Sequence, residues 1–140
     1  RYAVYSQQII SCVDSVCVCK FVYGPAWQLY NLQQWEEALR AITGWNVSLW
    51  EMMKVGERRI NLLRAFNARE GVGAEADTLP HKLTVPLKGG PTDGVRVSPE
   101  EFEDAKALYY AMVGWDERGY PTRAKLHELG IGWVADLIGV

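Results

Sequence analysis

Apolar residues recur at every third or fourth position in several stretches of this 140-residue chain, which is the spacing of amphipathic helices. Residues 2–18 show this pattern first, and it predicts a helix there rather than a strand. Residues 27–43 repeat it, and Gly44 is expected to end that second helix. The side chains expected in the core from this second stretch are Trp27, Tyr30, Trp35, Leu39 and Ile42.

A third and longer helix is predicted to start after Ser48. Ser48 and Glu51 have the spacing of a capping box, in which the Ser hydroxyl and the Glu carboxylate bond free amides at the helix start. Gly56 interrupts this helix, and close packing against another helix is the commoner reason for such a glycine. The face expected in the core holds Leu49, Met52, Met53, Ile60, Leu63 and Phe66 or Asn67, and the opposite face holds Lys54, Glu57, Arg58 and Asn61.

Two more helices follow in the second half of the chain. Residues 98–101 supply a capping Ser, a Pro at the first helical position and a Glu three residues after the Ser, and this helix is expected to run to about Val113. A shorter helix is expected over residues 122–129, capped by Thr122 and ended by Gly130. The buried stripe expected on the longer of the two comprises Phe102, Ala105, Leu108, Tyr109 and Met112.

Residues 71–97 are rich in Gly and Pro and lose all periodicity, which predicts a long loop of the kind that is functional or wraps another surface. Its histidine, His81, is assigned no role, because a metal site needs several convergent ligands. The tail over residues 131–140 is apolar but short. The whole pattern predicts an all-α fold: one irregular multi-helix domain over residues 1–140, with about five or six helices and one long loop.

Composition narrows the class of protein. The chain is 49% hydrophobic and 23% charged, so it can bury one sizeable core. Its net charge of -2 gives no reason to expect nucleic acid or an anionic membrane as a partner. No apolar run approaches the roughly 18 residues of a spanning helix. Three cysteines without a disulfide framework indicate a cytoplasmic protein, and because the chain begins with Arg1 we expect a fragment of a longer one.

The candidate chemistry lies in residues 14–21, where one acid and two thiols interrupt an apolar run. On composition alone, the commoner explanation is a capping Asp14 with inert core cysteines. On a regular helix Cys17 and Cys19 would lie about 200° apart and could not easily bind one metal. If the helix frays near Val18, Cys19 can turn outward before Gly24 and Pro25 end the segment. We therefore predict that Cys19 is the exposed thiol.

The third predicted helix also has a series of basic residues. A solvated face or structural ion pairs explain such a series more often than an anion site does. The phosphate of a cofactor is the alternative, because the fixed fork of guanidinium donors suits it. The series comprises Arg58, Arg59, Arg64 and Arg69.

Generic motifs such as a P-loop, a nucleophile elbow or a Cys-x-x-Cys pair are absent from the sequence. The chain nevertheless resembles the C-terminal domain of the tungsten- or molybdenum-containing aldehyde ferredoxin oxidoreductases. Residues 14–21 are similar to the family's Asp-x-x-Gly-Leu-Cys element with its Lys-Phe continuation. Residues 56–71 resemble its Gly-Glu-Arg and Arg-x-Phe-Asn-x-Arg-Glu-Gly elements. Residues 79–80 match its Leu-Pro loop, and residues 109–130 match its Gly-Trp-Asp and Lys-Leu-x-x-Leu-Gly elements.

This resemblance implies an enzyme of three domains that oxidises aldehydes to carboxylic acids and passes the electrons through a 4Fe-4S cluster to ferredoxin. It implies a tungsten or molybdenum bis-pterin cofactor, with Asp14, Cys17 and Val18 in the pterin-binding element and Cys19 as a ligand of the cluster. No residue of this chain is assigned a catalytic role, because the cofactors supply the chemistry. The partners implied are the N-terminal domains of the same protein and ferredoxin.

The sequence departs from the family pattern at two positions. Cys17 and Val18 stand where the family usually has Gly and Leu, so the backbone at Cys17 and the packing of the pterin are expected to differ. One thiolate cannot hold a cluster that needs four, so the isolated chain is expected to be inactive and cofactor-free. We expect it to expose an apolar surface around residues 2–21 and to self-associate, which makes a homo-oligomer one expected state.

Two alternatives stay open at this point. The first is a non-catalytic helical scaffold or interaction domain whose cysteines are inert. The second is a relative within the family that reduces an aromatic thioester instead of oxidising an aldehyde.

Overall fold

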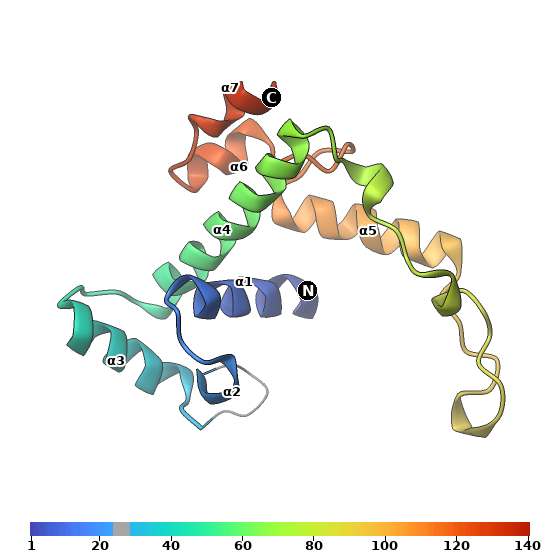
Figure 1. The fold of residues 1–140 in the computed structure, drawn as a ribbon, viewed down its shortest axis with the longest axis horizontal. Coiled ribbons are helices and arrows are strands. Elements are labelled where there is room, and N and C mark those ends of the chain that lie inside the picture. The colour runs from blue at the N-terminus through green and yellow to red at the C-terminus, as the bar shows by residue number, and fades with distance from the viewer. Residues whose placement is uncertain (24–28) are drawn as a thin grey trace.

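The computed structural model describes residues 1–23 and 29–140, and within them the chain forms α-helices and short 3-10 helices but no strand (Figure 1). The all-α prediction is confirmed. The α-helices are α1 (Tyr2–Ser15), α2 (Lys20–Tyr23), α3 (Leu32–Thr43), α4 (Leu49–Arg69), α5 (Pro99–Val113), α6 (Arg123–Glu128) and α7 (Val134–Ile138). The 3-10 helices are η1 (Ala74–Ala76), η2 (His81–Leu83) and η3 (Gly90–Thr92).

Helix α4 runs through the middle of the molecule, with α1 lying across it and with α6 and α7 at its C-terminal end (Figure 1). The backbones of α1 and α4 touch at Gly56. A Cβ added there would lie 1.8 Å from the carbonyl oxygen of Gln8 and 2.9 Å from the amide nitrogen of Cys12. The prediction that Gly56 marks close packing of another helix is confirmed.

Two separate hydrophobic clusters lie along α4. The cluster at its N-terminal half is built around Cys12, Val13, Trp35 and Met52, with Val16, Val18, Tyr23 and other partly buried residues packed on it. The cluster at its C-terminal half contains Ala65, Leu126, Leu129, Ile131, Val134 and Ala135. Helix α4 therefore joins the first part of the chain to the last.

The capping signals locate most helix starts correctly. Ser48 and Ser98 accept from the amides of Glu51 and Glu101, and both Glu side chains bond back to the cap amides. Thr122 caps α6 as expected. Helix α3, however, begins after Asn31, which forms a capping box with Gln34 that the sequence pattern did not reveal. Trp27 was predicted to lie in the core, and Gly24 and Pro25 to end the segment after the first helix. These three residues lie outside the described residues.

The predicted buried face of α4 is wrong in its C-terminal half. Leu63 and Phe66 are 52% and 55% exposed, whereas Glu57 and Asn61 are buried with Arg64. Polar groups can take the inner face because each finds a partner there. Lys54 and Lys125 donate to Glu57, the indole of Trp115 donates to Asn61 at 2.9 Å, and Arg64 bonds the turn around Gly119.

The stripes predicted for α5 and α3 also need correction. Tyr110 and Val113 are the buried residues of α5, while Leu108 and Met112 of the predicted stripe are exposed. Of the residues expected from α3 and the stretch before it, Trp35 is buried but Tyr30 and Ile42 are exposed. Hydrophobic spacing identified both helices and, through Trp35 and Leu39, the packed side of α3, but it placed more residues in the core than the two helices bury.

The loop predicted over residues 71–97 is confirmed, with η1, η2 and η3 as its local turns. Its distal part projects away from the helices (Figure 1) and is closed by backbone bonds from Leu87 to Val95 and from Gly94 to Leu87. The short apolar tail does form a helix, α7, which the sequence pattern missed. Its Val134 and Ala135 are buried in the C-terminal cluster, so tertiary packing stabilises five residues that have no propensity signal of their own.

We predict that Gly56→Ala destabilises the chain by at least about 2 kcal/mol, although Ala is the better helix former by about 1 kcal/mol, because the two backbones would have to separate. Urea unfolding of the purified chain measures the change. Asn67→Ala, at an exposed position of the same helix, is the matched control and should change the free energy of unfolding by less than about 0.5 kcal/mol. A Gly56→Ala chain as stable as the control would show that the backbones do not touch.

Candidate functional site

The segment between α1 and α2 presents two thiols at the surface. Helix α1 ends at Ser15, earlier than the predicted Val18, so neither Cys17 nor Cys19 lies on it. Cys17 has φ +57°, a left-handed conformation, and the amide of Val18 bonds back to the carbonyl of Val13 at 3.3 Å. Val16 and Val18 pack on the N-terminal cluster, while Cys17 and Cys19 are exposed. Cys19 is exposed as predicted, but Cys17 is exposed as well, and the helical geometry expected to turn Cys17 away from Cys19 is absent because α1 has already ended.

Cys12 differs from the other two thiols because it is part of the core. It is buried beside Val13, Trp35 and Met52. Burial raises the pKa of the Cys12 thiol to about 11, because a thiolate is poorly solvated there. Cys12 is therefore a protonated core residue at neutral pH.

Asp14 lies in the last turn of α1, with its side chain 40% exposed. Its carboxylate Oδ2 is 3.5 Å from Nη1 of Arg59 on α4. Among the described residues it accepts no bond from a backbone amide, so the capping role that was the simpler explanation for this acid is not seen. Asp14 and Cys19 thus leave the same end of α1 and face solvent.

A second polar cluster lies where α4, η1 and α5 meet. Arg64 is 7% exposed and makes a two-pronged contact with Asp77, at 3.0 Å and 2.6 Å. Its Nε donates to the carbonyl of Gly119 at 2.6 Å, its guanidinium lies over the ring of Trp115, and the Tyr110 hydroxyl donates to Asp77. Gly119 has φ +76°, and a side chain there would strike Arg64.

The ionisation of this cluster follows from its contacts. Burial alone would raise the pKa of Asp77, but the bonds from Arg64 and Tyr110 and the nearby positive charge outweigh it and hold that pKa below its usual value. Burial, together with the bond to Asp77 and its charge, raises the pKa of Tyr110 to about 12. Near neutral pH the cluster is therefore a fixed ion pair with a protonated tyrosine, which suits a structural clamp better than acid-base catalysis.

The other arginines of α4 also have partners within the chain. Arg58 donates to the carbonyl of Leu129 at 2.7 Å, and Arg69 pairs with its neighbour Glu70. Arg59 forms an ion pair with Asp14, and Arg64 forms one with Asp77. All four arginines of the series therefore make contacts within the chain. These contacts support the structural interpretation of the series and leave the phosphate alternative without an observation in its favour.

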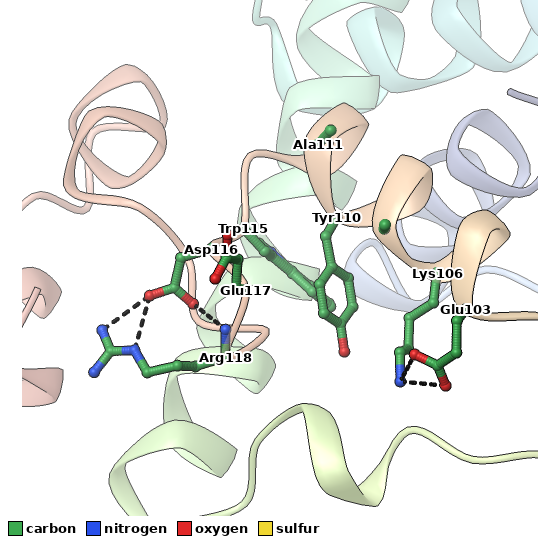
Figure 2. A pocket seen from close by; sticks show the side chains of 9 residues that line it. Glu103, Lys106, Tyr110, Ala111, Trp115, Asp116, Glu117 and Arg118 are labelled. Atoms are coloured by element: carbon green, nitrogen blue, oxygen red, sulfur yellow. Dashed lines mark hydrogen bonds and ion pairs between the residues drawn. The ribbon is translucent and has the colours of Figure 1, made fainter.

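A groove of about 750 Å³ runs beside the C-terminal half of α5 and the turn that follows it (Figure 2). Tyr110 and Trp115 form its apolar wall. Figure 2 shows two ion pairs along it, Lys106 with Glu103 and Arg118 with Asp116, whereas Glu117 of the same lining makes no ion pair with a described residue. A single exposed acid with no further polar group converging on it does not define a ligand site, and we assign the groove no chemistry.

Two features are absent from the described residues. No helix in residues 1–23 and 29–140 has the length and apolar content needed to cross a bilayer. The same residues contain no group of three or more His, Cys, Asp or Glu side chains placed to hold a metal ion.

A family model for domains 2 and 3 of aldehyde ferredoxin oxidoreductase matches residues 1–131. The chain belongs to the aldehyde ferredoxin oxidoreductase family. It is 34% identical over 134 residues to the tungsten-containing aldehyde ferredoxin oxidoreductase of Pyrococcus furiosus, and 33% identical over 134 residues to that of Thermococcus kodakarensis. Each match covers 94% of this chain and 21% of the relative, so the chain spans about one fifth of these oxidoreductases.

The family likeness extends to proteins with other named activities. An aliphatic sulfonate oxidoreductase subunit of Pyrococcus furiosus is 30% identical over 125 residues, which is 85% of this chain and 19% of the relative. The active-site complex BamBC of benzoyl coenzyme A reductase, solved with 1,5-dienoyl-CoA, shares the fold with a TM-score of 0.78 over 95% of this chain and 19% of its own. At 23% identity this likeness concerns the fold alone.

The residues at the end of α1 fit one side of a shared cofactor site. Cysteine thiolates are the usual ligands of iron-sulfur clusters, and the exposed Cys19 follows the exposed Asp14 by five residues. Because the described residues offer no complete ligand set, any cluster or metal held here would need ligands from elsewhere in the longer protein.

Sequence reasoning missed the partners of these groups. It placed Arg59 and Arg64 in one basic series and did not connect them with Asp14 and Asp77, because both pairs bridge elements whose approach is set by tertiary packing. Tyr110 and Asn61 were likewise not singled out, since a polar residue whose partner is distant in sequence gives no local signal.

We predict that Cys17→Gly stabilises the chain by about 0.5 to 1 kcal/mol. A left-handed conformation costs a non-glycine residue about 1 to 2 kcal/mol, which exceeds the entropy cost of a glycine in the unfolded chain. Cys19→Gly is the control, because Cys19 lacks a positive φ and the same change should cost stability there. Equal losses at both positions, measured by urea unfolding, would show that Cys17 is unstrained.

We predict that Asp77→Asn costs about 2 kcal/mol of stability at pH 7, because it leaves the buried Arg64 without a counter-charge. The pKa of Asp77 is lowered in the fold, so its contribution is present above its unfolded pKa of about 3.9 and is lost as the pH falls through the lower folded value. The difference from wild type should therefore shrink in acid. Asp104→Asn, at an exposed acid of α5, is the control, and a pH-independent difference for Asp77→Asn would contradict this account.

Proposed function

We propose that this chain is part of a longer enzyme that oxidises an aldehyde to a carboxylic acid and passes the electrons to ferredoxin. In that enzyme Asp14 contacts the pterin of a tungsten or molybdenum cofactor, with Cys17 and Val18 in the same element, and Cys19 is one ligand of a 4Fe-4S cluster. The observation that supports this most directly is the joint exposure of Asp14 and Cys19 at one end of α1, in the segment that resembles the family element.

The cofactors would supply the redox chemistry, and the residues of this chain would place and shield them. Asp14 would accept hydrogen bonds from ring nitrogens of the pterin, since a carboxylate accepts in two directions and a charged acceptor makes the stronger bonds. Val16 and Val18 hold the segment on the core, so the intervening Cys17 and the following Cys19 lie on its outer side. The rigid attachment would keep the Cys19 sulfur in place for a cluster whose other ligands lie outside this chain.

The surface of this chain also bears on how it would pack within the longer protein. We propose that residues 1–140 act as one domain of three and pack against the other domains through the exposed apolar residues of α1 and the segment after it, including Tyr2, Tyr5 and Phe21. We expect the isolated chain to self-associate for the same reason. The cytoplasm is the compartment we propose, because reducing conditions keep exposed thiols such as Cys17 and Cys19 free.

A relative that reduces an aromatic thioester is the second candidate, and the shared fold with a benzoyl coenzyme A reductase complex favours it. An assay of the full-length protein with simple aldehydes and a viologen acceptor, beside reduction of an aromatic thioester by a viologen donor, separates the two. Turnover of aldehydes supports the first proposal, and turnover of the thioester alone supports the second.

We predict that Cys19→Ser in the full-length protein abolishes or perturbs the electron paramagnetic resonance signal of the 4Fe-4S cluster and blocks ferredoxin reduction, because a ligand is lost. Cys12→Ser is a control in the core, and Cys17→Ser is a matched control at an exposed thiol two residues away. Both should leave the signal largely intact. An unchanged signal and normal ferredoxin reduction in the Cys19→Ser protein would refute the assignment.

We predict that Asp14→Ala in the full-length protein lowers bound tungsten or molybdenum per chain more than bound iron, because the pterin loses an acceptor while the cluster keeps its ligands. Elemental analysis of the purified protein measures both. Small and equal effects on the two metals would favour a structural role for Asp14.

A further inference from the structure

The position of Asp14 on its helix is electrostatically unfavourable. It lies in the last turn of α1, where the free carbonyl groups bear a partial negative charge that repels an acid. No basic residue lies in that turn to compensate. An acid that neither caps a helix nor suits its place in the helix needs another group to hold it.

Arg59 is the group that holds it. Its Nη1 lies 3.5 Å from Asp14 Oδ2 and donates to the hydroxyl of Ser11 at 3.3 Å, so the guanidinium spans one turn of α1. Ser11 is itself buried, and the Ser15 hydroxyl donates to its carbonyl at 2.8 Å. The distance between Arg59 and α1 is also set by the packing of α4, because α4 touches the backbone of α1 at Gly56, within one turn of Arg59.

We propose that Arg59 is a positioning residue for Asp14, an inference that rests on the pterin contact proposed above. The ion pair joins Arg59 Nη1 to Asp14 Oδ2, and neither carboxylate oxygen accepts a hydrogen bond from a described residue. The ion pair would favour one orientation of the carboxylate before a ligand arrives, and the carboxylate keeps the capacity to accept from N–H donors of a pterin. Such orientation lowers the entropy cost of binding. Residues that orient a binding side chain therefore affect the affinity of a cofactor site.

The test uses the full-length protein with Arg59→Gln, Asp14→Asn and the double variant. Tungsten or molybdenum, pterin fluorescence after oxidation, and iron are measured per chain after gel filtration, so the result does not depend on activity. Arg59→Gln should weaken retention of metal and pterin by about tenfold, the low end for loss of a supporting residue, and leave iron unchanged. Arg69→Gln, on the same helix but in contact with Glu70 and the ring of Phe66, is the matched control and should leave retention unchanged.

The double variant decides whether Arg59 acts through Asp14. If it does, Arg59→Gln adds no further loss in the Asp14→Asn background, and Arg59→Lys, which keeps the charge, restores part of the retention. An equal loss in both backgrounds, or normal retention in Arg59→Gln while Asp14→Asn loses the cofactor, overturns the positioning role and leaves the pterin contact standing. Normal retention in Asp14→Asn refutes the pterin contact and the inference with it. If Arg59→Gln fails to fold, Arg59→Lys compared in the two backgrounds gives the same decision.

Discussion

The backbone contact between α1 and α4 at Gly56 determines where this chain can offer chemistry. Because a glycine lets the helices meet at Gln8 and Cys12, the last turn of α1 lies beside the middle of α4. Arg59 can then reach Asp14, and the core residues around Cys12 and Met52 can anchor the turn that follows α1. The exposed acid and the exposed thiols are thus attached to a packed helix pair rather than to a free loop.

The other half of the chain is held to α4 by polar contacts as well as by a small apolar cluster. Glu57 is bonded by Lys54 and Lys125, Asn61 by Trp115, and Arg64 by Asp77 and Gly119. These contacts occupy the inner face of α4 and leave Leu63 and Phe66 on the outside. Since the oxidoreductases it matches are about five times longer, we expect other parts of the protein to cover this apolar face.

Local signals in the sequence predicted the helices better than their orientation. The boxes at Ser48 and Ser98 locate two helix starts because a cap acts within four residues, and the glycine of the α1–α4 contact could be anticipated from its cost inside a helix. The inner face of α4 could not be predicted, because the partners of Glu57, Asn61 and Arg64 are distant in sequence. The exposure of Cys19 was anticipated, but the left-handed turn at Cys17 appears only in the structure; the family's usual glycine at that position was the available hint.

The central claim, that this chain is one side of a metal and iron-sulfur site in a longer oxidoreductase, is tested most directly by the metal content and visible spectrum of the purified full-length protein. The account predicts that tungsten or molybdenum, iron and acid-labile sulfide co-purify with it, together with the broad visible absorption of an iron-sulfur cluster. A colourless full-length protein that binds neither iron nor tungsten or molybdenum would contradict the account and favour an inert helical scaffold.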